Sequence, residues 1–348
     1  MIMIRIGIIS PSEIAFRRFM PALSLLSDNF KFVGIAYATP QEWFDNPAEV
    51  ADDVIENQQI VERNKAQQFI DNYGGKLYHG YESLIKSDDV DAVYIPLPPA
   101  LHYKWAEKAL TCRKHVFVEK PSTISLQDSK ALVNKALSSS LALHENYMFV
   151  FHNQIDELKK VIDSGEIGDV RLYRMMFGFP RRQQSDFRYN KKLGGGTLFD
   201  NAGYTVKSAS FLLGDTARIV SSNLGYVSDF DVDVFGSATM KNADGIVAQL
   251  AFGMDCDYRC ELEVWGSKGT IIADRFFTAP AGFTPKYTIK KNQDIEQRNL
   301  PADDTFRKSL LYFKACIENE NTRKESYISI VRQAELIEQI ITLNNNNN

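Results

Sequence analysis

The feature that most constrains the fold of this chain is the alternation of short apolar runs with helical patterns over its first 145 residues. A doubly wound parallel sheet requires such an alternation, because a helix follows each strand and returns the chain to the same edge of the sheet. We expect strands at residues 4–9, 32–38, 92–95, 115–118 and 141–145, and helices at 13–26, 101–110 and 126–137. Right-handed units of this kind leave a crevice at the carboxyl ends of the strands. The sequence therefore predicts a doubly wound parallel domain over residues 1–147.

The second half of the chain has a different pattern. Glycine- and asparagine-containing turns join consecutive strands there, which indicates an antiparallel sheet. We expect a helix at 153–164, strands at 170–177, 218–227, 234–240, 246–252, 259–265 and 270–273, and closing helices at 303–319 and 326–343. The predicted fold class is α/β, with a second α+β domain over residues 148–343 that carries a large, mostly antiparallel, open-faced sheet. The asparagine run at 344–348 is expected to be a frayed tail.

A long polar stretch separates the second strand from the next clear helix, which we expect near residues 64–73. Connections from a strand to a helix in such folds commonly have two to six residues. The stretch at 39–62 is therefore interpreted as an insertion, with a short helix near 47–56. It would lie beside the adenosine side of a nucleotide site, and a plain surface excursion is the alternative.

Composition excludes several classes of protein. The 348 residues carry a formal net charge of -4, and neither sign forms long blocks, so a nucleic-acid surface is disfavoured. The apolar run at residues 4–9 is too short for a secretory signal or a membrane span. We expect a globular protein of the cytoplasm that does not bind membranes.

Cysteine and histidine do not form a metal-binding pattern. The four cysteines are scattered, and Cys256 and Cys260 would stand roughly 13 Å apart along a strand at ~3.3 Å per residue. They are expected to be plain buried thiols. The five histidines lack zinc-like spacing, so no metal is predicted.

Two motifs carry the candidate chemistry. Glu119-Lys120-Pro121 follows the strand at 115–118, and the glycine-rich segment at 194–204 places Asp200 and Tyr204 one helical turn apart. Hydride delivery to a ketone builds negative charge on oxygen, so a neighbouring acid must donate a proton. Tyr204 is the candidate donor and Lys120 the cation beside it, which would hydrogen-bond the substrate hydroxyl or the nicotinamide ribose. Asp200 would orient Lys120 or contact the sugar.

The turn after the first strand departs from the usual dinucleotide pattern. Glycines normally let the backbone approach the pyrophosphate there, whereas this chain has Ser10 and Ser12 at the first two positions. Small residues still permit a close turn, and amides at a helix start bind phosphate whatever the side chains are. We therefore assign Ser10, Ser12, Glu13 and Ile14 to cofactor binding.

Several sequence segments, which occur in the family's order and with its spacing, make the chain similar to the Gfo/Idh/MocA family of NAD(P)-dependent oxidoreductases. The resemblance covers nearly the whole chain. The two motifs above are its most specific marks. The others are the segments at 93–102, 145–147 and 164–168. Most members carry histidine four residues after the aspartate, whereas this chain has Tyr204. Members that reduce the 3-keto group of sugar nucleotides in deoxysugar biosynthesis are similar in having tyrosine there, and the segments at 144–147, 186–189 and 265–269 resemble that subgroup.

The resemblance implies further site residues. The nicotinamide ring would lie against a wall that prolines make rigid, with a histidine and a glutamate near the cofactor: Pro96, Leu97, Pro98, His102 and Glu119. A sugar-nucleotide substrate would contact Asn146, Tyr147, Arg188, Tyr189, Asn201 and Tyr204. Arg181 and Arg182 are expected to lie in a solvated loop.

The preferred cofactor is NADP, with NAD as the alternative. A carboxylate at the end of the second strand would bond the 2′-hydroxyl of NAD, and residues 35–39 contain none. With the insertion looped out, Arg63 occupies the place where similar chains keep an arginine for the 2′-phosphate.

Two other functions stay open. One is a sugar or trans-dihydrodiol dehydrogenase of the same family that works in the oxidative direction. The other is a non-catalytic dinucleotide-binding regulator, which the two missing glycines favour and the retained Lys120, Asp200 and Tyr204 disfavour. A homodimer or homotetramer that pairs through the open face of the second sheet is expected in each case.

Overall fold

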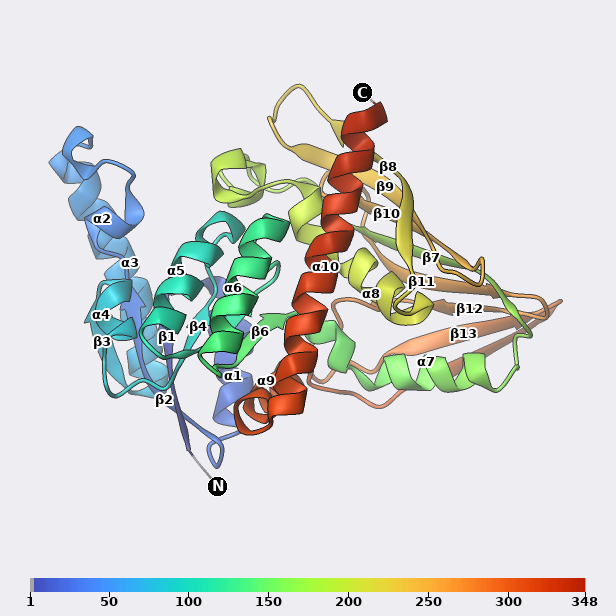
Figure 1. The fold of residues 1–348 in the computed structure, drawn as a ribbon, viewed down its shortest axis with the longest axis horizontal. Helices are drawn as coiled ribbons and strands as arrows, with labels where there is room; N and C mark the ends of the chain where they lie inside the picture. The colour runs from blue at the N-terminus through green and yellow to red at the C-terminus, as the bar shows by residue number, and fades with distance from the viewer. Residues whose placement is uncertain (1–2, 348) are drawn as a thin grey trace. The chain divides into compact units, whose positions relative to one another are not determined.

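The computed structural model describes residues 3–347 and divides the chain into two compact units (Figure 1). The first unit contains the residues up to Thr123 together with Gln127–Asn146 and Ser309–Ile330. The second contains Ile124–Leu126, Tyr147–Lys308 and the residues from Val331 onward. The division therefore falls between Asn146 and Tyr147 and again within each of the last two helices.

The first unit is built on a six-stranded sheet in the order β3-β2-β1-β4-β5-β6. All five strand pairs are parallel, which confirms the doubly wound α/β fold. The strand order reverses between β1 and β4, and this is the place where open parallel sheets bind ligands. The strands are β1 (Ile4–Ile9), β2 (Phe30–Tyr37), β3 (Lys76–His79), β4 (Ala92–Ile95), β5 (His115–Glu119) and β6 (Leu143–Asn146).

Helices connect these strands. The neighbouring helices α5 and α6 are joined by an ion pair between Lys135 and Glu107 (Figure 1). The connections are a π-helical segment (Ala15–Phe19) continuing into α1 (Met20–Ser24), then α3 (Asp52–Tyr73), α4 (Tyr81–Ile85), α5 (Pro99–Thr111) and α6 (Leu126–Ser138). The sequence did not predict β3 and α4. Only Tyr78 is buried among the four residues of β3, so this strand has no apolar run to mark it.

The polar stretch at 39–62 is more ordered than a looped-out excursion. It forms α2 (Pro40–Trp43), a 3₁₀ turn (Pro47–Glu49) and the first half of α3, so the expected helix starts at Asp52 rather than near residue 64. No glycine or proline interrupts the chain between 52 and 73, and α3 stays helical although its first half buries little. Gln59 on α3 donates from Nε2 to the carbonyl of Ala38 at 2.8 Å, which attaches the helix to the end of β2.

The second unit is built on an eight-stranded sheet in the order β14-β13-β12-β11-β7-β10-β9-β8. Every pair is antiparallel except β7 with β10. The strands are β7 (Val170–Gly178), β8 (Arg218–Tyr226), β9 (Asp233–Lys241), β10 (Val247–Gly253), β11 (Arg259–Gly266), β12 (Thr270–Ala273), β13 (Lys286–Lys291) and β14 (Asp294–Asn299). The two last strands were not predicted, because their sequences are rich in charged and polar residues.

One face of this sheet is covered by α7 (Asn153–Asp163), α8 (Gly203–Leu213) and the end of α10 (Glu320–Asn347), which follows α9 (Thr305–Glu318). Along β11 the predicted alternation is confirmed, since Cys260, Leu262 and Val264 are buried. The opposite face keeps large apolar side chains exposed, including Phe235 at 45% and Trp265 at 54%.

Two expectations for this unit were wrong. The asparagine run does not fray over its described part: α10 continues to Asn347, and Asn344 Oδ1 accepts from the N–H of Leu224 at 2.8 Å. Residue 348 lies outside the described residues. Cys256 is exposed rather than buried, because it lies in the turn after β10 and not on a strand.

Candidate active site

The turn after β1 keeps a left-handed bend without glycine. Ser10 has a φ of 80°, and its N–H donates to the carbonyl of Ala36 at 3.0 Å. Ser12 Oγ accepts from the N–H of Ala15 at 3.2 Å and so caps the helix that begins there. The bend fits the predicted pyrophosphate turn, although it leaves steric strain at Ser10 that glycine would avoid. Glu13 on this helix is exposed and pairs with Arg17 at 3.6 Å.

His102 joins two loops at the carboxyl edge of the first sheet. Its side chain is fully buried, and its ring nitrogens lie 2.7 Å from the carbonyl oxygens of Leu97 and Pro121. Burial lowers the pKa of His102 to about 4, although both carbonyl groups act in the opposite direction. The ring is therefore neutral at pH 7 and donates one proton to one of the two carbonyls. The ring therefore lies between the loop with Pro96, Leu97 and Pro98 and the loop after β5, and its contact with a cofactor stays a prediction.

Glu119 and Lys120 end β5. Glu119 Oε1 accepts from the hydroxyl of Tyr94 and from Nδ2 of Asn146, each at 2.7 Å. Burial raises the pKa of Glu119, while those two donors and the Lys120 ammonium oppose the shift. Lys120 is partly exposed at this edge. The structure thus brings Glu119 and Asn146 together, although they were predicted to contact cofactor and substrate respectively; those contacts stay predictions.

A carboxylate that the sequence analysis missed lies near the end of β2. Glu42 accepts backbone N–H groups of Thr39 and Tyr81 with Oε2, each at 2.9 Å, and of Glu82 with Oε1 at 3.0 Å. Both oxygens are therefore used by the backbone. Arg63 is exposed on α3, four residues after Gln59, so both lie on the same face of the helix that is tied to the end of β2.

The glycine-rich segment in the second unit passes very close to other atoms. Gly196 has a φ of 112°, and a Cβ there would overlap Oδ1 of Asp233. The chain then forms a π-helical segment (Leu198–Ala202) that runs into α8, so Asp200 lies within a widened turn and Tyr204 follows it at the start of α8. Such π-helical turns are frequent at functional sites.

Asp233 on β9 anchors the start of this segment. Its Oδ2 accepts the N–H of Leu198 at 2.7 Å, and its side chain is buried. Burial raises the pKa of Asp233 to about 6, although backbone N–H groups favour the ionised form. Asn201 supports the same segment: its amide donates to the carbonyls of Phe177 and Gly253 and accepts from the hydroxyl of Thr197. Asn201 is fully buried, and its contact with substrate stays a prediction.

Asp200 forms an ion pair that the sequence did not predict. Arg188 donates from Nε to Asp200 Oδ2 at 2.7 Å and from Nη1 to Asp186 Oδ1 at 3.1 Å. Burial alone would lower the pKa of Arg188, but the two carboxylates raise it. The guanidinium is thus permanently charged, partly exposed at 22%, and held rigidly between two acids.

Tyr204 stands in a cluster of aromatic rings. Its ring is 8% exposed and makes edge contacts with Phe177 at 5.1 Å and Tyr147 at 5.6 Å, and a tilted contact with Phe149 at 5.6 Å. Tyr147 is almost fully buried and supports Tyr204 from the core. Side-chain rotation of Tyr204 is therefore restricted by packing.

Tyr189 and the two arginines before it also have defined positions. The hydroxyl of Tyr189 donates to the carbonyl of Met254 at 3.0 Å, and its ring stacks on Phe230 at 4.1 Å. Arg181 and Arg182 are exposed in a loop, as expected, and Arg181 pairs with Asp229 and Asp255 of neighbouring turns. An open hollow of about 450 Å³ lies over this loop, lined by Gln184, Tyr189, Ser228, Asp229, Phe230 and Asp231.

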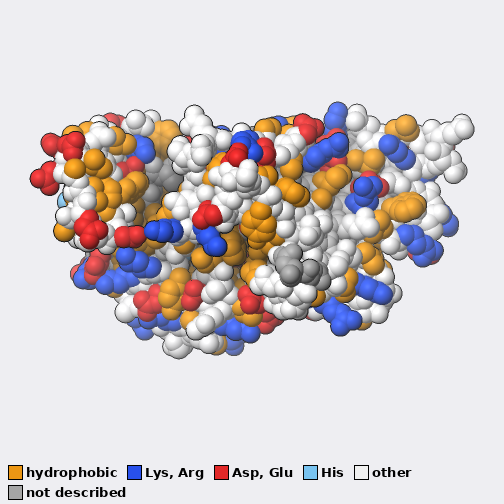
Figure 2. All heavy atoms as spheres, turned by 90° about the horizontal axis from the view of Figure 1, so that it is seen from above, with side chains coloured by type: hydrophobic (Ala, Val, Ile, Leu, Met, Phe, Trp, Pro, Cys, Tyr) orange, Lys and Arg blue, Asp and Glu red, His pale blue; other side chains and the backbone are white. Residues whose placement is uncertain are grey.

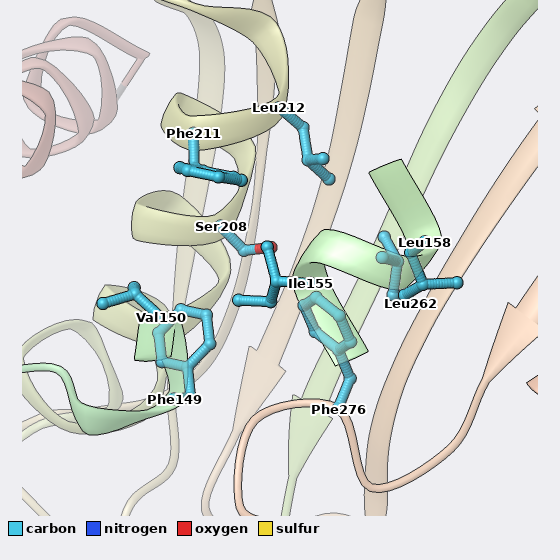
Figure 3. A pocket seen from close by; sticks show the side chains of 9 residues that line it. All are labelled: Phe149, Val150, Ile155, Leu158, Ser208, Phe211, Leu212, Leu262 and Phe276. Carbon is cyan, nitrogen blue, oxygen red and sulfur yellow. The ribbon is translucent and has the colours of Figure 1, made fainter. Parts of the chain in front are cut away.

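A second hollow lies within the core of the second unit (Figure 3). Ile155 and Leu158 of α7 meet Ser208 and Phe211 of α8 there, over Leu262 of the sheet. It holds about 10 Å³, no more than one water needs, and its lining is almost wholly apolar. It is a packing gap rather than a ligand site.

The surface, the possible metal ligands and the helix lengths can also be described. Figure 2 shows acidic and basic side chains interspersed on the face it draws, without a continuous basic area. Within residues 3–347, no three His, Cys, Asp or Glu side chains are grouped to hold a metal ion. Over the same residues, none of the helices has both the length and the apolar character needed to cross a bilayer.

The first unit is a doubly wound sheet with a dinucleotide turn. The second is an α+β unit with a buried tyrosine and an ion-paired aspartate. Together they are the arrangement of a nicotinamide-dependent oxidoreductase. Residues 18–147 match the model of the oxidoreductase family with an NAD-binding Rossmann fold. Residues 155–272 match the GFO/IDH/MocA C-terminal domain. The chain belongs to the Gfo/Idh/MocA family, which confirms the resemblance found in its motifs.

Characterised relatives align along almost the whole chain. The dTDP-3,4-didehydro-2,6-dideoxy-alpha-D-glucose 3-reductase of Actinomadura kijaniata is 35% identical over 342 residues, 97% of this chain and 95% of that one. The enzyme of the same name from Saccharopolyspora spinosa is 32% identical over 97% of this chain and 96% of its own. The crystal structure of KijD10, a 3-ketoreductase from A. kijaniata in complex with NADP and TDP-benzene, matches with a TM-score of 0.87 at 34% identity over 97% of both chains. KijD10 has also been solved with one tyrosine changed to phenylalanine and with one lysine changed to alanine.

Replacing Asp233 with asparagine tests the buried carboxyl group. The folded protein holds the Asp233 proton with a pKa of about 6, above the ordinary value of 3.8. Its stabilising contribution is therefore complete below about pH 4 and is lost as the pH rises through about 6. We expect the free energy of unfolding of the parent, minus that of Asp233→Asn, to fall by about 2 kcal/mol between about pH 4 and pH 7.

Urea unfolding at the two pH values measures this difference. The control is Asp231→Asn, an exposed neighbour on the same segment, which should follow the parent at both. A difference between parent and Asp233→Asn that does not change with pH would contradict the assignment.

Proposed function

We propose that this protein reduces the 3-keto group of a sugar nucleotide with NADPH. The observation that carries the proposal is the 35% identity over 97% of the chain to a 3-reductase of this type, together with Lys120, Asp200 and Tyr204 in register with the family motifs. The reaction adds a hydride to the carbonyl carbon and a proton to its oxygen. When bound, the nicotinamide supplies the hydride.

The residues of this chain supply the proton and the electrostatics. Tyr204 gives the proton of its hydroxyl to the ketone oxygen as negative charge develops there. A phenol with an ordinary pKa of ~10 needs a cation to stabilise the phenolate that results. The ammonium of Lys120 has this role. The packed rings around Tyr204 hold the phenol in one orientation, which limits the entropy lost on reaching the transition state.

Asp200 and Arg188 have a supporting role in substrate binding. The ion pair fixes the carboxylate of Asp200 at the widened turn before Tyr204. Arg188 keeps part of its guanidinium exposed, and a planar guanidinium suits a diphosphate or a sugar hydroxyl. We therefore assign Asp200 to orientation and Arg188 to contact with the polar part of the substrate.

The preference for NADP has two structural supports. The acid near the end of β2, Glu42, already accepts three backbone N–H groups, which leaves it less acceptor capacity for the 2′-hydroxyl of NAD. Arg63 is exposed on the helix face that is tied to the end of β2. An arginine in this position suits a 2′-phosphate.

All four cysteines are free thiols, in keeping with the reducing cytoplasm expected from the sequence. Recovery of the protein in the cytoplasmic fraction of its cells is the check on this compartment.

Tyr204→Phe should reduce kcat by at least a hundredfold while the affinity for NADPH stays within about twofold, because proton donation is lost and the dinucleotide site is unchanged. Lys120→Ala should be at least as damaging. Consumption of NADPH with a dTDP-linked 3-keto sugar as substrate measures both, and Tyr226→Phe, an exposed tyrosine on the second sheet, is the control. Turnover of Tyr204→Phe within twofold of the parent would remove Tyr204 from the mechanism.

Arg63→Ala should weaken NADPH binding much more than NADH binding, by about tenfold or more, since only NADPH carries the 2′-phosphate. Fluorescence titration with each cofactor measures the two affinities. Lys31→Ala removes an exposed cation at the opposite end of β2 and should change neither. Equal losses for both cofactors, or none, would refute the assignment of Arg63.

We also propose that the open face of the second sheet pairs with another copy of the chain, giving a homodimer or homotetramer. Exposed Phe235 and Trp265 support this, because pairing with another copy would remove both large apolar side chains from water. The charged residues of β11 already have partners within one chain, since Glu263 pairs with Arg174 and Glu261 with Arg259. The interface would then depend on apolar contact.

Light scattering at micromolar concentration should give a mass of two or four chains. Trp265→Asp should lower that mass, whereas Ile328→Asp, on a helix at 70% exposure, should leave it unchanged. A strictly monomeric mass for the parent would show that the open face is only a solvated surface.

A further inference from the structure

A glutamine from the C-terminal helix reaches the backbone next to Tyr204. Gln333 lies on the part of α10 that belongs to the second unit, and its side chain is 2% exposed. Its Nε2 donates to the carbonyl of Gly203 at 3.0 Å and lies 3.4 Å from the hydroxyl of Tyr147. One amide group therefore contacts the residue before Tyr204 and a ring on which Tyr204 packs.

The orientation of the Gln333 amide is determined by its partners. A backbone carbonyl only accepts, so the nitrogen rather than the oxygen must face Gly203. The amide oxygen is then buried without a protein partner among the described residues. A buried acceptor left in this state destabilises a fold, and an apolar side chain of similar size would avoid the loss. Stability of the fold alone therefore does not explain a glutamine at position 333.

The contact at Gly203 is tight. A Cβ at Gly203 would overlap the hydroxyl of Tyr147, so backbone and phenol touch directly. Gly203 is the first residue of α8, where the π-helical segment ends and Tyr204 begins its turn. A shift of this carbonyl moves the Cα of Tyr204, and a shift of Tyr147 removes the edge contact with the ring of Tyr204.

We propose that Gln333 is a positioning residue for the reduction, which sets the place of the Tyr204 phenol through the Gly203 carbonyl and the Tyr147 hydroxyl. The inference rests on the proposed function, since it assumes that Tyr204 is the proton donor. It assigns the C-terminal helix α10 a part in the reaction. Neither the Glu-Lys-Pro motif nor the glycine-rich motif includes a residue of this helix. Misplacement of a donor by a fraction of an ångström lowers the rate of proton transfer without weakening substrate binding.

Gln333→Met keeps the length and volume of the side chain and removes both hydrogen bonds. We expect kcat for the dTDP-linked 3-keto sugar to fall at least tenfold, with KM for NADPH and for the sugar nucleotide within twofold of the parent. The matched control is Gln339→Met on the same helix. Gln339 Oε1 accepts from the N–H of Ile219 at 2.9 Å, so the control also loses a bond from helix to sheet, but far along the helix from Gly203. It should keep kcat within twofold.

A double-mutant cycle identifies the route of the effect. In the Tyr204→Phe background, Gln333→Met should cause no further loss of kcat, because the group it positions is already absent. Tyr147→Phe keeps the ring, removes the hydroxyl and should lower kcat in the same direction, and it replaces Gln333→Met as the test if that variant does not fold. Two outcomes would overturn the inference. In one, Gln333→Met lowers kcat equally with and without the Tyr204 hydroxyl. In the other, the Gln333 and Gln339 variants lose the same amount of kcat. Full activity of Tyr204→Phe would instead refute the proposed function itself.

Discussion

The position of the proposed proton donor depends on close approaches of backbone to side chain that only glycine allows. At Gly196 the chain has a positive φ and passes against Asp233, and at Gly203 it touches the hydroxyl of Tyr147. Between these points Asp233 and Asn201 hold the segment against β7, β9 and β10. The widened helical turn that carries Asp200 is therefore fixed at both ends, and Tyr204 follows directly from it.

Buried hydrogen bonds also fix the loops at the carboxyl edge of the sheet in the first unit. The neutral ring of His102 lies between the loops after β4 and β5 and donates to one of the two carbonyl groups that face it, while Glu119 accepts from Tyr94 and Asn146. Such buried hydrogen bonds make loop positions specific, because moving a loop would break them. In both units, buried residues outside the two sequence motifs position the residues to which we assign the chemistry.

Sequence patterns predicted the fold better than they predicted the contacts of the site. Runs of apolar residues gave five of the six parallel strands, and alternation gave the buried face of β11, because both patterns follow from burial alone. The strands β3, β13 and β14 were missed: β3 and β14 lie at sheet edges, β13 lies next to an edge, and all three carry many charged or polar residues in place of an apolar run. The helical start of α3 was missed for the same reason: its first half buries little, so no periodic apolar face marks it.

The sequence by itself determined the α/β class, the family and the residue types of the candidate site, because strand periodicity and the Glu-Lys-Pro and glycine-rich motifs are local features of the chain. Only the tertiary structure decided which partners those residues have. Arg188 pairs with Asp200, Glu42 gives both its oxygens to backbone amides, and Gln333 reaches Gly203 across 130 positions of sequence. Such contacts join residues that are distant in the chain, and they depend on burial and close packing that no local pattern records.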